Sequence, residues 1–289
     1  MSISGNGASE AKTGKGGDDL WETIKTIGLA LLLALVIKTL LLQPFTIPSA
    51  SEEPNLYEGD YIIVSKWPYG YSHHSILFSP PLFKGRILFT PPRRGDVMVF
   101  KLPRSGHIDY IKRLIGLPGD RIQVKAGRLY ITDAELPVSH DKTVEVTDRL
   151  FPEQAEWRWE TNPEGRRYLT QIHGAGDGSG DNTGVYVVPP HCYFMMGDNR
   201  QNSLDSRFDP QMEPGDPKLG GCEWDCRLDE QISGMAGMAP QEAGVGFVPE
   251  ENLVGRAEIV LLSWNKGASI FKPWTWLDLR LNRFFHRIS

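Results

Sequence analysis

Residues Thr26 to Leu42 read TIGLALLLALVIKTLLL, the most apolar stretch of the 289-residue chain. Seventeen residues at the helical rise span roughly 25 Å, at the short end for one membrane crossing. Lys38 interrupts the stretch only near one end, where its ammonium group can reach the membrane interface. Between Ile27 and Ile37 the segment has no polar face, whereas a helix packed in a soluble domain would normally have one. We predict a transmembrane helix over residues 26–43, with a cleaved signal peptide ending near Ser49 to Ser51 as the alternative.

Residues 1–25, on one side of this helix, are rich in Gly and Ser and predict a disordered cytoplasmic tail. Lys12, Lys15 and Lys25 precede the helix, whereas Gln43 to Ser65 contains neither Lys nor Arg. Positive charge favours the cytoplasmic side of a membrane. We therefore expect a single-pass membrane protein with a cytoplasmic N-terminus and everything after residue 43 outside the cytoplasm.

The overall composition excludes several classes of protein. One apolar segment and 23% charged residues argue against a disordered chain and against a multi-span membrane protein. A formal net charge of -5 argues against a nucleic-acid partner. The motifs GxSxG, HExxH, GxxxxGK[ST] and GxGxxG are absent from the sequence. We expect neither a cofactor nor a metal.

Beyond the helix, apolar and polar residues alternate with period two, which predicts short strands separated by Pro/Gly turns. The fold class is therefore mostly β: a β-rich catalytic domain with a smaller inserted β subdomain, tethered by one N-terminal helix. The strands are predicted at Tyr61–Val64, Asp96–Phe100, Asp109–Ile111, Arg121–Val124, Arg128–Ile131, Val185–Val188 and Ala257–Leu262.

The domain boundaries follow shifts in composition. Residues 44–136 and 185–273 predict the catalytic β domain, and the more polar residues 137–184 predict the inserted β subdomain. A second insertion, 209–244, carries Cys222 and Cys226, which we expect to form a disulfide while Cys192 stays a buried thiol. Residues 274–289 predict an amphipathic helix, either packed on the domain or lying at the lipid interface.

Three further segments carry the chemistry. The first, residues 43–60, follows the helix directly and contains Pro48-Ser49-Ala50-Ser51. The second, residues 94–120, contains Asp109-Tyr110-Ile111-Lys112-Arg113. The third is Met196-Gly197-Asp198-Asn199-Arg200-Gln201-Asn202-Ser203-Leu204-Asp205-Ser206-Arg207.

In this order, behind a membrane anchor, the three segments closely resemble type I signal peptidase, from about residue 26 to about residue 262. The resemblance implies a membrane-bound Ser/Lys endopeptidase that removes signal peptides from exported preproteins after an Ala-x-Ala site. It implies Ser51 as the nucleophile and Lys112 as the general base, with Ser49 and the Ser51 N–H forming the oxyanion hole. Its partners would be signal peptides and membrane lipid, close to the secretion translocon.

The remaining site residues are carried over from the same resemblance. Ser203 would hydrogen-bond and orient the Lys112 amine, Asp205 and Arg207 would form a supporting ion pair, and Tyr110 would support the site. An extended substrate would contact the chain at Ile47, Pro48, Ala50, Asp109 and Ile111. A lysine can act as the base only when its amine is neutral, which burial favours.

One position departs from the family pattern, because Glu52 stands where Met usually follows the nucleophile. A carboxylate near Lys112 would favour the protonated amine and weaken the base, whereas a solvent-facing one would do little. The alternatives are a catalytically weak or silent membrane-tethered binding protein, or a related Ser/Lys peptidase that processes pilin precursors.

Overall fold

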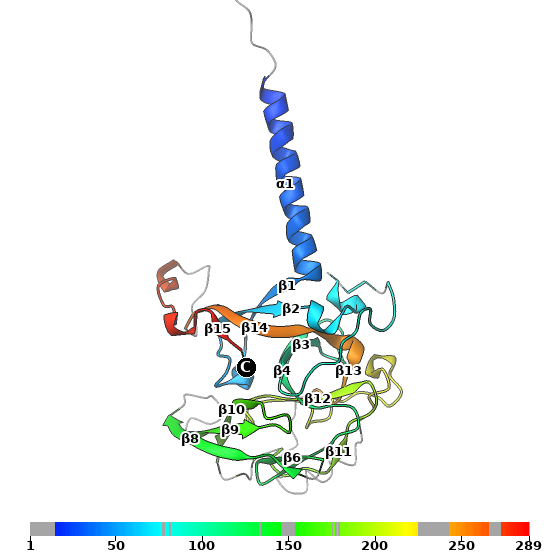
Figure 1. Ribbon diagram of the computed structural model, residues 1–289, viewed down its shortest axis with the longest axis vertical. Helices are drawn as coiled ribbons and strands as arrows, with labels where there is room; N and C mark the ends of the chain where they lie inside the picture. Colours follow the sequence, from blue (N-terminus) through cyan, green and yellow to red (C-terminus); the bar gives the residue numbers. More distant parts are fainter. Residues whose placement is uncertain are drawn as a thin grey trace, which may run out of the picture.

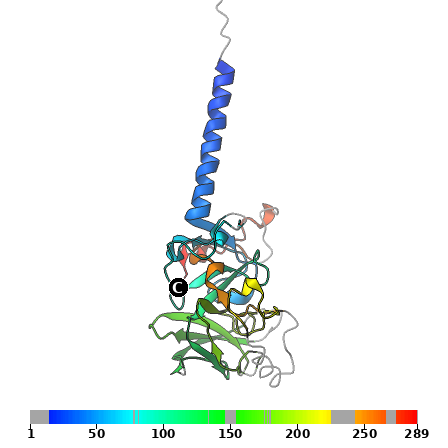
Figure 2. The ribbon, with the colours of Figure 1, turned by 90° about the vertical axis from the view of Figure 1, so that its right-hand side faces the viewer.

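The computed structural model describes residues 15–76, 79–80, 82–132, 134–145, 154–174, 176, 178, 180–224, 243–265 and 273–288. One long helix rises from a β-rich body, with the largest sheet next to the helix and the smaller sheets at the far end (Figures 1 and 2). The mostly β architecture with a single N-terminal apolar helix is thus confirmed.

Helix α1 runs from Lys15 to Leu40. Its part from Leu20 to Leu40 is long and apolar enough to cross a membrane, and none of it is buried against the rest of the protein. The predicted limits were wrong at both ends. The helix begins inside the expected tail, where Glu22 and Lys25 pair at 2.9 Å one turn apart and extend it. Of the tail, residues 1–14 lie outside the described residues.

The helix ends before residue 43 because the chain joins a sheet there. Strand β1 (Leu42–Thr46) pairs antiparallel with β2 (Asp60–Ser65), and Pro44 lies within it. Proline lacks an N–H, and β1 is the edge strand of its sheet, where that loss is tolerated. Tyr71 donates its hydroxyl proton to the Leu40 carbonyl at 2.7 Å and so satisfies one orphan group of the helix end.

The main sheet has the order β1-β2-β14-β3-β4-β12-β13, and β15 also pairs with β14. Every pairing is antiparallel. The alternation of apolar and polar residues, which predicted short strands, thus corresponds to an antiparallel sheet. The bounds of the strands not yet given are β3 Val97–Lys101, β4 Asp109–Gly116, β12 Cys192–Met196, β13 Val248–Pro249, β14 Leu253–Ser263 and β15 His286–Arg287.

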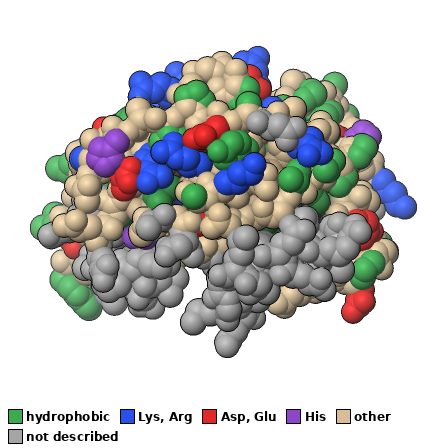
Figure 3. Space-filling model, turned by 90° about the horizontal axis from the view of Figure 1, so that it is seen from below, with side chains coloured by type: hydrophobic (Ala, Val, Ile, Leu, Met, Phe, Trp, Pro, Cys, Tyr) green, Lys and Arg blue, Asp and Glu red, His purple; other side chains and the backbone are tan. Residues whose placement is uncertain are grey.

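Two smaller sheets complete the body. One has the order β11-β5-β6-β7, and the other the order β10-β9-β8. Their bounds are β5 Arg121–Lys125, β6 Arg128–Ile131, β7 Ala134–Glu135, β8 Val138–Glu145, β9 Gln154–Thr161, β10 Arg167–His173 and β11 Tyr186–Val187. Both sheets lie at the end of the body away from α1 (Figure 1). On that end, acidic and basic side chains are interspersed with apolar ones (Figure 3), as suits a face in water.

The C-terminal segment is not the helix that its apolar periodicity predicted. Residues Leu281–Arg283 form a single 3-10 turn, and β15 then pairs with β14. The cause is tertiary: Arg283 donates to Asp60 at 2.6 Å and to the Asn55 carbonyl at 2.8 Å. Contacts of this kind override a local helical preference.

The predicted disulfide was also wrong. Cys192 on β12 is bonded to Cys222, 30 residues away, so Cys192 is not a free thiol. Both residues are fully buried in the same apolar cluster, with Trp224 packed against it. Cys226 lies outside the described residues, as do residues 225–242 of the second insertion. Spacing along the chain could not show that residue 222 folds back onto β12.

Candidate active site

Ser51 lies in a short 3-10 turn, Ala50–Glu52, in the connection between β1 and β2. Ser51 is buried in this turn, with only 9% of the residue exposed. Asn199 fixes the turn from the far side. Its backbone N–H donates to the Ser51 carbonyl at 3.1 Å and its Nδ2 to the Ala50 carbonyl at 3.2 Å.

Lys112 projects from β4 toward this turn. It pairs across the sheet with Met98 of β3 and is only 3% exposed. Its Nζ lies 2.5 Å from the Ser51 Oγ and donates to the Ile111 carbonyl at 2.9 Å. Two residues that lie 61 positions apart in the sequence therefore share a hydrogen bond in a buried setting.

Glu52, the departure from the family pattern, also faces Lys112. Its side chain is 1% exposed, and its Oε1 lies 3.4 Å from the Lys112 Nζ. Its Oε2 is buried and has no hydrogen-bond partner among the described residues. Burial raises the pKa of the Glu52 carboxyl well above its usual range, against the opposing influence of the Lys112 cation. The carboxyl therefore does not point to solvent.

A second buried ion pair lies beside the first. Arg113, the neighbour of Lys112 on β4, binds Asp198 through two parallel bonds of 2.7 and 2.8 Å. Asp198 also accepts from Asn55 Nδ2 at 2.7 Å. The pair ties the 197–200 loop to β4 and to the chain after the nucleophile. Our site prediction missed Arg113, Asp198, Asn199 and Asn55, although all four lie in the three segments that carried the resemblance.

The 197–207 loop places its predicted residues in different ways. Asp205 and Arg207 form the expected ion pair at 2.9 Å, and both are fully buried. The Gly197 N–H donates to Asp205 at 3.0 Å, and with Arg207 it lowers the pKa of the Asp205 carboxyl despite burial. Gly197 has no room for a side chain, because a Cβ there would lie 2.2 Å from the Ser203 Oγ and 2.5 Å from the Ser51 carbonyl oxygen.

Ser203 does not make the hydrogen bond predicted for it. Its Oγ is buried without a partner among the described residues, and the Lys112 amine instead contacts Ser51, Ile111 and Glu52. The carboxyl of Glu52 occupies a place on the amine where the resemblance had implied the Ser203 hydroxyl. A sequence pattern gives the residues near an amine but not which of them it binds.

The remaining predicted residues differ in how exposed they are. Ser49 is exposed, with its Oγ 3.4 Å from the Ser51 Oγ. The Lys112 Nζ lies 6.0 Å from the centre of the Tyr110 ring. Residues Ile47 and Ile111 are buried, Ala50 is partly buried, and Pro48 and Asp109 are exposed. Within the described part of the chain, no group of three His, Cys, Asp or Glu side chains could hold a metal ion.

The first residues of β4 offer a free edge next to the site. Strand β12 pairs with β4 only between Arg113 and Gly116, while β3 pairs along the whole of Asp109–Arg113 on the other side. In the described chain, the β12 side of Asp109 to Lys112 therefore has no partner strand. Such an edge can accept an extended peptide.

Comparison with known proteins identifies the family of the chain. The sequence model of the family described as "Signal peptidase, peptidase S26" matches residues 20–264. The chain is 34% identical to the signal peptidase I of Rickettsia canadensis over 284 residues, which cover 91% of this chain and 92% of that protein. It is 34% identical to the signal peptidase I of Rickettsia typhi over 274 residues, which cover 89% of each.

Among solved structures, the chain is similar to the crystal structure of a signal peptidase I from Enterococcus faecalis V583. The identity is 21%, the match covers 58% of this chain and 97% of that one, and the TM-score is 0.26.

Proposed function

The chain belongs to the signal peptidase family, peptidase S26, and we propose that it cleaves its substrates with Ser51 as nucleophile and Lys112 as general base. Family membership makes it a peptidase of signal peptides, and its apolar helix α1 makes it membrane-anchored. The dyad, the cleavage site and the orientation in the membrane belong to the proposal.

The single observation that carries the dyad is the 2.5 Å contact between the Lys112 Nζ and the Ser51 Oγ in a buried setting. A serine hydroxyl becomes a strong nucleophile only when a base takes its proton. In the proposed first step, the neutral Lys112 amine accepts that proton while Oγ attacks the scissile carbonyl. The ammonium group then gives the proton to the leaving amine, and a water molecule hydrolyses the ester.

The negative charge that forms on the carbonyl oxygen needs donors aimed at it. We assign this role to the Ser49 hydroxyl and the Ser51 backbone N–H. The Ser49 side chain lies beside the nucleophile, with 3.4 Å between the two oxygens, and is exposed to an incoming peptide. Removing one such donor typically reduces the rate by about 10²–10³-fold.

Substrate would bind as an extended strand along the free edge of β4 from Asp109 to Ile111, with Ile47 to Ala50 on its other side. Small apolar pockets there would select Ala-like residues one and three positions before the cut. Ser51 follows the end of α1 at Leu40 by 11 residues, so the cut would occur near the membrane surface. We assign the catalytic domain to the periplasmic side of the inner membrane, near the secretion translocon and in contact with lipid.

The test is cleavage of a preprotein with an Ala-x-Ala site by the purified full chain in neutral detergent. We expect one cut, located by mass spectrometry of the new N-terminus, and loss of cutting when the last Ala is replaced by a large residue. The matched control is Ser51→Ala. Cleavage of a pilin precursor in place of the Ala-x-Ala substrate would favour the related pilin-processing peptidase.

One observation favours a second candidate, a membrane-tethered protein with little or no catalysis. Glu52 is buried 3.4 Å from the Lys112 amine and, when ionised, would hold that amine protonated. The same cleavage assay separates the two functions. A chain that binds the signal peptide without cutting it at any pH between 6 and 10 would be the binding protein.

A further inference from the structure

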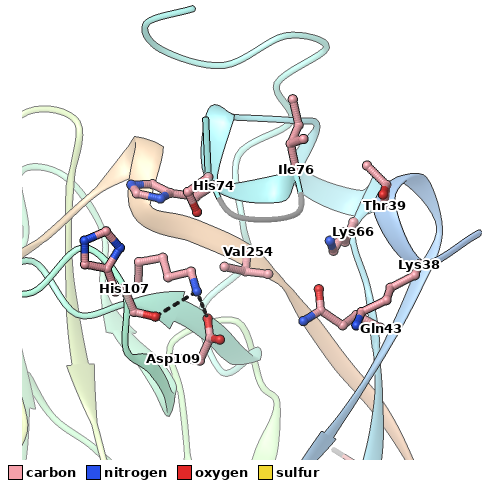
Figure 4. Close-up of a pocket in the computed structure, with 11 residues that line it drawn as sticks. Lys38, Thr39, Gln43, Lys66, His74, Ile76, His107, Asp109 and Val254 are labelled. Atoms are coloured by element: carbon pink, nitrogen blue, oxygen red, sulfur yellow. Dashed lines mark hydrogen bonds and ion pairs between the residues drawn. The ribbon is translucent and has the colours of Figure 1, made fainter. Parts of the chain in front are cut away.

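A cavity of about 340 Å³ lies where α1 meets the β-rich body, away from Ser51 and Lys112. Figure 4 shows His74 and His107 on one side, a group of four residues on the other, and Val254 between them. The group of four consists of Lys38, Thr39, Gln43 and Lys66. The helix end and the main sheet therefore build it together. Its volume is at the lower end for small-molecule sites, enough for a compact polar group.

The cavity is strongly basic. Three lysines line it, Lys38, Lys66 and Lys101, together with a single acidic residue, Asp109. Asp109 is already bound to Lys101, with 2.9 Å between the charged atoms. With both histidines neutral, the lining carries a formal charge of +2. Positive charge of this kind favours an anion.

Lys66 shows that this charge is not neutralised within the protein. It is 3% exposed, and its Nζ donates to the Ser75 carbonyl at 2.6 Å. Burial, opposed by Asp109 and reinforced by Lys38 and Lys101, lowers the pKa of the Lys66 ammonium to about 8. A buried cation in such surroundings is costly, and an anion beside it would remove the cost.

His74 provides an independent sign of a missing partner. Its Nδ1 is buried and has no hydrogen-bond partner among the described residues. Burial, together with His73, Lys101, Arg86 and His107, lowers the pKa of the imidazole to about 4, so the ring is neutral at pH 7. A neutral imidazole has one N–H to donate to an anionic oxygen.

The carbonyl groups at the C-terminal end of α1 carry partial negative charge, but they are already hydrogen-bonded and do not neutralise the cavity. The Leu40 carbonyl accepts from the Tyr71 hydroxyl at 2.7 Å, and the Leu41 carbonyl accepts from the Lys66 backbone N–H at 3.0 Å. Lys38 lies in the last turn of the helix, where a cation is favourable. No bond or ion pair within the described residues uses its ammonium group, which is therefore available to a ligand.

We propose that this cavity binds the phosphate group of an anionic phospholipid. The source is argued from position: Lys38 is two residues from the end of the segment that is apolar enough to span a membrane, so the cavity opens at the level of lipid headgroups. Exposed Trp67, Leu82, Leu88, Trp274 and Leu277 belong to two segments, cyan and red in Figure 1, that lie at the same end of the body. The proposal concerns binding and stands whether or not Ser51 is the nucleophile.

The test uses the full chain in neutral detergent at constant ionic strength and pH 7. Thermal unfolding is followed while dihexanoyl-phosphatidylglycerol is added, with dihexanoyl-phosphatidylcholine, glycerol phosphate and inorganic phosphate as separate arms. A ligand that binds only the folded state raises the Tm with concentration. We expect a saturable rise with the anionic lipid and little change in the other three arms.

Variants then locate the site. Lys38→Gln, on the exposed face of the helix, should weaken the apparent affinity for the anionic lipid about tenfold, as the loss of one charge-assisted bond predicts. Lys66→Met provides a second variant on the body, and Lys125→Gln, exposed and far from α1, is the matched control. Equal affinity in Lys38→Gln, Lys66→Met and the control would overturn the proposal. So would an equal Tm rise with phosphatidylcholine, glycerol phosphate or inorganic phosphate.

Discussion

Lys112 and Lys66 are two lysines buried to the same extent, each 3% exposed, in two parts of one molecule. The Lys112 amine contacts the Ser51 hydroxyl at 2.5 Å and lies 3.4 Å from the Glu52 carboxyl. The Lys66 amine donates to a backbone carbonyl. Asp109 favours the charged form of Lys66, but Asp109 is itself bound to Lys101. Lys112 therefore has a serine hydroxyl and a carboxyl beside it, whereas Lys66 has the cations Lys38 and Lys101 near it.

This difference separates two uses of a buried amine. The Glu52 carboxyl can balance the charge of the Lys112 amine, because a single proton on either group leaves the pair neutral. At Lys66 the protein supplies no such compensation, so the positive charge remains available to an external anion. The same residue type is therefore proposed as a proton acceptor in one place and as part of an anion site in the other.

The largest effect should come from breaking the catalytic pair. Ser51→Ala and Lys112→Met should each reduce kcat/KM for a preprotein by at least about 10³-fold, because the Ser51 hydroxyl attacks effectively only when the Lys112 amine takes its proton. The double variant should be little worse than either single one. Cleavage is followed by gel densitometry, and folding by circular dichroism and Tm.

Lys66→Met is the control, because it shows whether cleavage depends on Lys112 in particular or on any buried lysine. It removes an equally buried lysine and should leave kcat/KM within about tenfold of the parent chain. Substantial cleavage by Lys112→Met would refute the dyad. A loss of activity in Lys66→Met as deep as in Lys112→Met would show that buried charge in general, rather than one base, supports cleavage.

The next effect concerns the carboxyl that distinguishes the two lysines. When the pair's proton sits on Lys112, the ionised Glu52 stabilises that inactive form, and the neighbouring Arg113 and Asp198 influence Glu52 in opposite directions. Glu52→Gln and Glu52→Met remove the charge. We expect the acid limb of kcat/KM against pH to move to lower pH by up to about one unit, or up to tenfold on that limb.

The size of this shift is limited by burial, which raises the pKa of Glu52 and so favours placing the proton there. Glu53→Gln, which removes the next carboxyl along the chain, is the matched control and should leave the limb in place. If the limbs of Glu52→Gln and the parent chain superimpose, then Glu52 carries the proton in the resting enzyme and Lys112 is free of it. That result would contradict the expected weakening of the base.

The sequence predicted the sheet well because alternation is a local property. The strand at Arg128–Ile131, for example, was placed to the residue. The membrane helix also follows from local hydropathy. The resemblance named Ser51 and Lys112 as partners, and the structure brings them together, although their roles await the experiments above.

What could not be predicted depends on contacts between distant residues. The apolar periodicity of residues 277–288 predicts a helix, yet the bonds from Arg283 to Asp60 hold that segment against β2. Cys222 is bonded to Cys192 on β12 and not to Cys226, which is nearer in the sequence, because the 30-residue segment folds back. The burial of Glu52 and the absence of a hydrogen bond between Ser203 and Lys112 likewise depend on how β4 and the 197–207 loop come together.

The last prediction concerns the pH dependence of stability that Lys66 contributes. The pKa of Lys66 is about 8 in the folded chain, against the ordinary 10.5 expected when unfolded. Below pH 8 both states are protonated, so the folded state bears the full cost of the buried cation. Between pH 8 and 10.5 the folded state loses the proton first, and stability should rise with pH by on the order of 2–3 kcal/mol.

Lys66→Met should abolish this rise, because methionine has no proton to lose. The unpaired Ser75 carbonyl left behind adds a cost that does not vary between pH 7 and 10.5. The measurement is the free energy of unfolding from denaturant titrations at pH 7, 8, 9 and 10, with Lys125→Met as the control for an exposed lysine. Saturating anionic lipid should flatten the curve of the parent chain in the same way, since an anion beside Lys66 stabilises its charged form. Parallel curves for the parent chain and Lys66→Met would mean that Lys66 is compensated within the protein, and the contrast with Lys112 would then disappear.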